Sequence, residues 1–155
     1  MYDRHDELLH GERLLIRTVR LLALTAPCHG LRAHFEQACG CAGEEAYRTL
    51  EVFLQQLSLR GRKRLTLSVP SDPRLTSDEL VVLDAFGCAQ AEDYRSLDER
   101  LTGLVGGEPP LALGAAACVV AQTFAMNGLM LRARATPDEA ELAPDCCAPL
   151  RMAAE

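Results

Sequence analysis

The chain has 155 residues, a length typical of one domain, and a net charge of −6. Three Tyr, four Phe and no Trp are available, so the core must be built mainly from aliphatic side chains. The acidic balance disfavours nonspecific binding of nucleic acid by the molecule as a whole.

The first part of the chain predicts three helices, because apolar residues recur there at helical spacing. Their approximate ranges are 3–24, 31–39 and 44–59. The charged residues of the first helix lie largely off its apolar stripe. They are Glu12, Arg13, Arg17 and Arg20. Gly61 follows the third helix and is expected to end it in the left-handed conformation.

Residues 65–69 alternate apolar and polar side chains, which is typical of a strand. No other stretch alternates, so we expect an extended connector unless this segment pairs with its copy in a dimer. Thr76 and Glu79 form a capping box, which predicts a helix from Ser77 to about Gln90. A further helix is expected from about residue 91 to 105.

The stretch Leu111–Leu131 contains 21 residues without a charge, and it predicts a central helix over about 109–134. Its length would suit a membrane span of roughly 20 residues. The many Ala and Gly residues and the polar Gln122, Thr123 and Asn127 argue against a membrane span. A helix that is apolar on every side is expected to be surrounded by the rest of the chain.

We therefore expect an all-α, single-domain bundle of five or six helices around this central helix, covering residues 1–135. Residues 136–155 follow no period and are expected to form a loosely ordered tail. The charged N-terminus lacks the apolar core of a signal peptide, so a cytoplasmic location is expected.

A cluster of thiols and imidazoles places five potential metal ligands within fourteen positions. The cluster consists of Cys28, His29, His34, Cys39 and Cys41. Zinc and iron prefer such ligands, so either metal is a possible cofactor. No CxxC pair is present, and the alternative is buried cysteines with solvent-facing histidines.

The adjacent pair Cys146 and Cys147 is a second thiol feature, with a redox role or incidental exposure as its two interpretations. The chain has seven cysteines in all, an odd number, which in a reducing compartment predicts free thiols, metal ligands or redox-active groups rather than a disulfide framework. Cys88 and Cys118 lie in apolar helices and are expected in the core.

A compact basic turn places four cations in five residues. Its cations are Arg60, Arg62, Lys63 and Arg64. Guanidinium groups bind phosphates and carboxylates bidentately, so the turn is a candidate anion-binding site. Alternatively, its charges stabilise the end of the preceding helix through the helix dipole. The absence of aromatic residues between the arginines argues against nucleic acid as the ligand.

No familiar catalytic motif occurs, which favours a non-enzymatic function. The primary hypothesis is a small cytoplasmic regulatory or protein-interaction domain. The alternatives are a metal- or redox-responsive protein using Cys28–Cys41 and a protein that binds an anion or nucleic acid through Arg60–Arg64. Apolar helix faces exceed what one bundle can bury, especially on the helix from Ser77, so a protein partner and a homodimer are expected.

Overall fold

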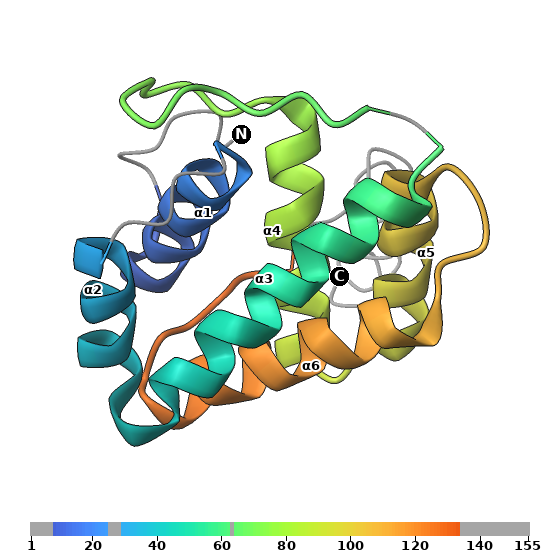
Figure 1. Ribbon diagram of the computed structural model, residues 1–155. Coiled ribbons are helices and arrows are strands. Elements are labelled where there is room, and N and C mark those ends of the chain that lie inside the picture. The colour runs from blue at the N-terminus through green and yellow to red at the C-terminus, as the bar shows by residue number, and fades with distance from the viewer. Residues whose placement is uncertain (1–7, 25–28, 63, 134–155) are drawn as a thin grey trace, which may run out of the picture.

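Residues 8–24, 29–62 and 64–133 are described by a computed structural model. Six α-helices and a short 3-10 turn form most of this part of the chain (Figure 1), which confirms the all-α bundle. The helices are α1 His10–Ala23, α2 His29–Cys39, α3 Gly43–Arg60, α4 Ser77–Gln90, α5 Tyr94–Val105 and α6 Leu111–Met126, with the 3-10 turn at Gly40–Ala42.

The most buried helix is α4. The sequence instead predicts that the helix at about 109–134 lies at the centre of the fold. Every residue from 82 to 89 is buried. In Figure 1, α4 stands behind α3, and it packs against α5 and α6 and also contacts α1. The apolar side chains of α4 are thus largely covered by other helices of the same chain. The expectation that α4 has a large exposed apolar face was therefore wrong.

The predicted central helix ends earlier than expected, since α6 stops at Met126 and Gly128 turns the chain with a φ of 73°. One side of α6 packs against α3 and α4, whereas Leu111 and Met126 are 94% and 72% exposed. The expectation that this helix is surrounded was therefore wrong. No described helix is long and apolar enough to cross a membrane.

After α6 the chain returns to the core as an extended segment, 129–133, that lies against α1 and α4. Two glycines permit this close approach. A Cβ on Gly11 would lie 3.1 Å from the Leu129 Cβ, and one on Gly87 would lie 2.4 Å from the Arg132 carbonyl oxygen. The buried Glu12 carboxylate accepts hydrogen bonds from the Arg132 amide at 3.1 Å and from its guanidinium at 2.6 Å.

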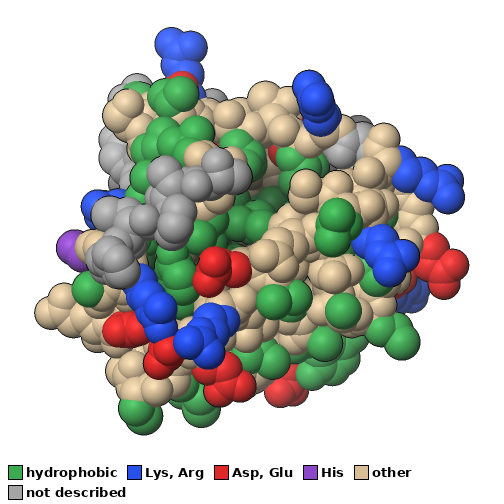
Figure 2. All heavy atoms as spheres, in the orientation of Figure 1, with side chains coloured by type: hydrophobic (Ala, Val, Ile, Leu, Met, Phe, Trp, Pro, Cys, Tyr) green, Lys and Arg blue, Asp and Glu red, His purple; other side chains and the backbone are tan. Residues whose placement is uncertain are grey.

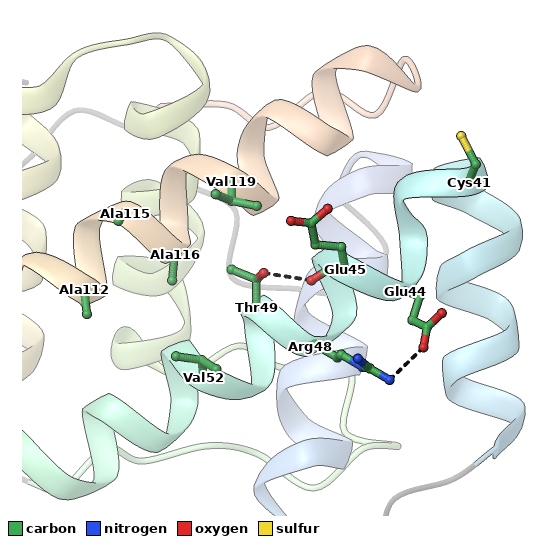
Figure 3. Close-up of a pocket in the computed structure, with 10 residues that line it drawn as sticks. All are labelled: Cys41, Glu44, Glu45, Arg48, Thr49, Val52, Ala112, Ala115, Ala116 and Val119. Atoms are coloured by element: carbon green, nitrogen blue, oxygen red, sulfur yellow. Dashed lines mark hydrogen bonds and ion pairs between the residues drawn. The ribbon is translucent and has the colours of Figure 1, made fainter.

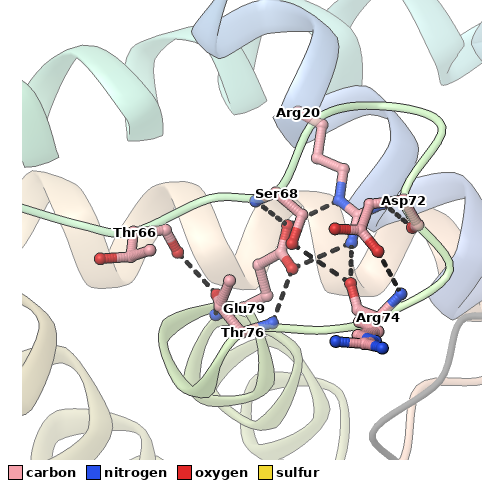
Figure 4. Close-up of polar contacts among 7 residues, drawn as sticks. All are labelled: Arg20, Thr66, Ser68, Asp72, Arg74, Thr76 and Glu79. Atoms are coloured by element: carbon pink, nitrogen blue, oxygen red, sulfur yellow. Dashed lines mark hydrogen bonds and ion pairs between the residues drawn. The ribbon is translucent and has the colours of Figure 1, made fainter.

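Buried ion pairs join distant segments of the chain. They include two charged residues of α1 that helical spacing places off its apolar stripe. Glu12 and Arg20 are fully buried, while Arg13 and Arg17 are exposed. Arg20 pairs with Glu79 of α4 (Figure 4). Burying a charge is costly unless it is paired and hydrogen-bonded, so partners far along the chain decide which charges enter the core.

The connector is extended, as predicted, and lies along the start of α4. The Thr66 amide donates to Asp78 at 2.8 Å, and the Thr76 hydroxyl donates to the Thr66 carbonyl at 2.6 Å. The predicted capping box is confirmed, because the Glu79 amide donates to the Thr76 hydroxyl at 3.1 Å. Gly61 is extended rather than left-handed, with φ −68° and ψ 134°.

Candidate functional site

A groove of about 620 Å³ runs between α3 and α6 (Figure 3). The α6 side is lined by small residues, Ala112, Ala115 and Ala116, together with Val119. Alanines have short side chains, so they leave space above the helix that another helix can approach closely. The opposite wall is formed by α3, which contributes Thr49 and Val52.

Apolar side chains extend beyond this groove along both helices. We call the whole area the α3–α6 face, and it consists of Val52, Leu59, Leu111, Ala112, Ala115, Val119 and Met126, all exposed. Figure 2 shows apolar side chains spread across the lower part of this view, where α6 runs in Figure 1. Large apolar patches on a soluble protein usually mark interaction sites.

Charged residues border the groove at the start of α3. Arg48 donates to the Glu44 carboxylate across one helical turn at 2.8 Å, and Figure 3 shows both side chains turned away from α6. The Glu45 carboxylate extends toward Val119 in the same view. An apolar centre with a polar rim is the usual organisation of a protein interface.

The groove places a few polar groups beside its apolar walls. Its lining contains alkyl side chains, two carboxylates and one guanidinium, together with the Thr49 hydroxyl and the Cys41 thiol. The Thr49 hydroxyl donates to the Glu45 carbonyl at 2.7 Å, so it is engaged in its own helix.

The predicted metal ligands are not brought together in the part of the chain that the structure describes. Cys28 and the side chain of His29 lie outside the described residues. Cys39 is buried, whereas Cys41 is exposed at the end of the α3–α6 groove. His34 is exposed and lines a different groove, between α1 and α2.

No group of three potential ligands capable of holding a metal ion occurs among the described residues. Burial raises the pKa of the Cys39 thiol to about 11, which disfavours the thiolate that a metal would need. The zinc or iron hypothesis for the full five-residue set stays a prediction, because Cys28 and the side chain of His29 are not described.

The remaining cysteines are Cys88 in α4, Cys118 in α6 and the pair Cys146 and Cys147. Cys88 is buried, as predicted, and Cys118 is only partly buried. Burial raises the pKa of the Cys118 thiol above its usual value. Cys146 and Cys147 lie outside the described residues, as does the predicted tail 136–155, so their proposed redox role stays a prediction.

The basic turn lies at the surface, with Arg60, Arg62 and Arg64 exposed and Lys63 outside the described residues. Arg62 and Arg64 border a hollow of about 700 Å³ between α1, α3 and the connector. Figure 2 shows it as a hollow with apolar side chains inside, above α3. The Arg62 side chain also lies near Gly107. Two of the arginines therefore border a hollow lined by both apolar and polar side chains, and the anion-binding hypothesis for the turn stays a prediction.

The α3–α6 face was missed by sequence reasoning, which treated the alanines of α6 as core. The spacing of Leu111, Ala115, Val119, Gln122 and Met126 places them along one side of a helix. Gln122 in this row was the available signal that this side meets water. No protein-family model matches the chain, and no curated protein or solved structure is significantly similar to it.

Proposed function

We propose that this chain is a non-enzymatic protein-interaction domain that forms a homodimer through its α3–α6 face. The observation that carries the proposal is the exposure of large apolar side chains on both helices that border one groove. Leu59, Leu111 and Met126 are each more than two-thirds exposed, at 77%, 94% and 72%. Leaving them in water costs free energy that an apolar partner surface would recover.

A second copy of the chain suits this face because of the spacing of its residues. If two α6 helices cross antiparallel at Ala115, Leu111 of each copy lies opposite Val119 of the other, since both are four residues from the crossing point. Ala115 has a short side chain, which allows the two backbones to approach closely. Such an arrangement is self-complementary, as a two-fold interface requires.

A charge-swap experiment tests this arrangement. Leu111→Glu alone and Val119→Lys alone should each convert the dimer to a monomer, because each buries two unpaired charges across the two-fold axis. The double variant Leu111→Glu/Val119→Lys should recover dimer formation, since each acidic group then faces a basic one. The two positions are more than two helical turns apart within one chain, so an ion pair inside the chain cannot explain recovery.

Val69→Glu is the matched control, because Val69 is 60% exposed on the connector, away from the α3–α6 face. It should leave the association state unchanged. Sedimentation velocity on the wild type and all four variants gives the comparison, with circular dichroism confirming that each remains folded. A dimer that survives both single substitutions would exclude the α3–α6 face as the interface.

A further inference from the structure

A second groove, of about 460 Å³, lies between α1 and α2 and has a different chemistry. Four of the side chains that line it carry guanidinium or imidazole groups, and none of the described lining residues is acidic. The lining consists of His10, Arg13, Leu14, Arg17, His34, Gln37 and Ala38. The groove thus combines basic groups from two helices on a protein whose net charge is −6.

Three arginines on other helices each pair with a glutamate one turn away: Arg32 with Glu36 at 3.1 Å, Arg48 with Glu44 at 2.8 Å and Arg95 with Glu99 at 3.7 Å. On α1 the positions one turn apart are Arg13 and Arg17, and neither forms an ion pair with a described residue. Like charges at this spacing destabilise a helix slightly, so an external anion would stabilise this arrangement.

The acidic groups nearest in sequence on both helices are engaged elsewhere. Glu12 of α1 is buried and pairs with Arg132 at 2.6 Å. Glu36 of α2 pairs with Arg32, which also contacts Glu44. Neither carboxylate lines the groove, so the described walls provide no internal counterion.

We propose that the α1–α2 groove binds a small anion that carries two or more phosphate groups. Arg13 and Arg17 lie one helical turn apart, and their Cβ atoms are therefore about 5–6 Å from each other. Each guanidinium can donate two parallel hydrogen bonds to one phosphate. His34 and Gln37 contribute donors from the opposite wall, so the anion would be held from both helices.

A small ligand fits these observations better than a nucleic acid. A long polyanion gains affinity by neutralising many phosphates along an extended basic surface. Here the basic groups are confined to one groove, and the molecule as a whole is acidic, so a longer chain would extend over repulsive surface.

Calorimetric titration with inorganic triphosphate tests the proposal on the full chain. The wild type should bind one anion per chain at about 0.15 M salt, and the ring signals of His10 and His34 should shift in NMR spectra. The double variant Arg13→Gln/Arg17→Gln should weaken binding at least about tenfold, because two charge-assisted contacts are lost.

Arg60→Gln/Arg64→Gln is the matched control, since it removes the same charge from the competing basic turn. It should leave affinity within about twofold of the wild type. The proposal is overturned if the wild type does not bind triphosphate, or if the control variant loses as much affinity as the groove variant. It is also overturned if a single-stranded oligonucleotide binds more tightly than triphosphate at the same salt concentration.

Discussion

Arg20 of α1 and Glu79 of α4 form a two-point ion pair with no exposed side-chain surface, with N···O distances of 2.6 and 3.0 Å. The Arg20 guanidinium also donates to the carbonyl oxygens of Asp72 and Arg74, at 2.8 and 2.7 Å (Figure 4). Glu79 accepts from the Thr76 amide at 2.9 Å. One buried pair therefore joins α1, the turn before α4 and the first turn of α4.

The first prediction concerns this pair. Arg20→Met should lower the free energy of unfolding by about 3–5 kcal/mol, because it leaves the buried Glu79 carboxylate without its counterion. Urea unfolding followed by circular dichroism measures the loss. Arg95→Met is the control, since the Arg95 side chain is 92% exposed, and it should change stability by less than about 0.5 kcal/mol. Equal effects of the two substitutions would show that the buried pair does not stabilise the fold.

The second prediction concerns pH. Burial alone would raise the pKa of Glu79, but hydrogen bonds from Arg20 and from the Thr76 and Ser68 amides outweigh it and hold this pKa below its usual value. As the pH falls below about 4.3, an unfolded glutamate binds a proton, whereas the native carboxylate remains ionised until the pH reaches its own lower pKa. The unfolded state then binds more protons, so this contribution to stability is complete above that pH and is lost as the pH falls.

Glu79→Gln removes the titrating group and provides the comparison. The variant should be less stable at neutral pH, and its urea midpoint should fall less steeply between about pH 5 and pH 3 than that of the wild type. If the urea midpoints of the two proteins fall equally steeply over this pH range, Glu79 does not contribute to the pH dependence.

The third prediction separates two neighbouring thiols. Burial raises the pKa of the Cys39 thiol to about 11, whereas Cys41 is exposed two residues later. Iodoacetamide at mildly alkaline pH should therefore modify Cys41 in the native protein and reach Cys39 only after unfolding. Peptide mapping by mass spectrometry after short labelling times distinguishes the two sites. Labelling of Cys39 and Cys41 at equal rates would contradict the buried position of Cys39.

The fourth prediction compares two helical glycines. Gly87→Ala should destabilise the protein by about 1–3 kcal/mol or more, because the new Cβ would lie 2.4 Å from the Arg132 carbonyl oxygen. Gly103→Ala should stabilise it by about 0.5–1 kcal/mol, since no atom lies within 4 Å of that Cβ and α5 is favoured by alanine. Thermal unfolding of both variants measures the difference. A similar change in both would show that segment 129–133 does not pack against α4.

Local sequence patterns predict most of the fold. The capping box at Thr76 and Glu79 depends on residues three apart, and the structure forms it where expected. The apolar spacing of α3 likewise predicts its buried side, which includes Leu50, Phe53 and Leu57. Such features need only the chain within a few residues, so a single sequence contains the necessary information.

Long-range partners explain what the sequence could not predict. Gly61 is extended because the chain continues directly into the connector, where the Arg62 amide donates to the Val105 carbonyl at 2.7 Å. Arg20 is buried because it forms an ion pair with Glu79, which lies far along the chain. Local periodicity contains no information about either of these long-range contacts. It therefore predicts only that Arg20 lies off the apolar stripe of its helix.

The candidate sites also depend on long-range packing that local sequence patterns do not contain. The apolar composition of α6 predicts a buried helix, yet its packing against α3 and α4 leaves one side exposed, including Leu111 and Met126. The basic α1–α2 groove combines His10, Arg13 and Arg17 with His34, which sequence proximity had grouped with the cysteines. Only the packing of two helices brings these residues to one groove.

The mass of the wild-type protein across a dilution series at micromolar concentrations tests the proposed homodimer most directly. Light scattering or sedimentation equilibrium provides this measurement without any substitution. The α3–α6 interface predicts a mass of about twice the 16.9 kDa of one chain, falling toward the monomer value only on strong dilution. A mass of 16.9 kDa at every concentration would contradict the account.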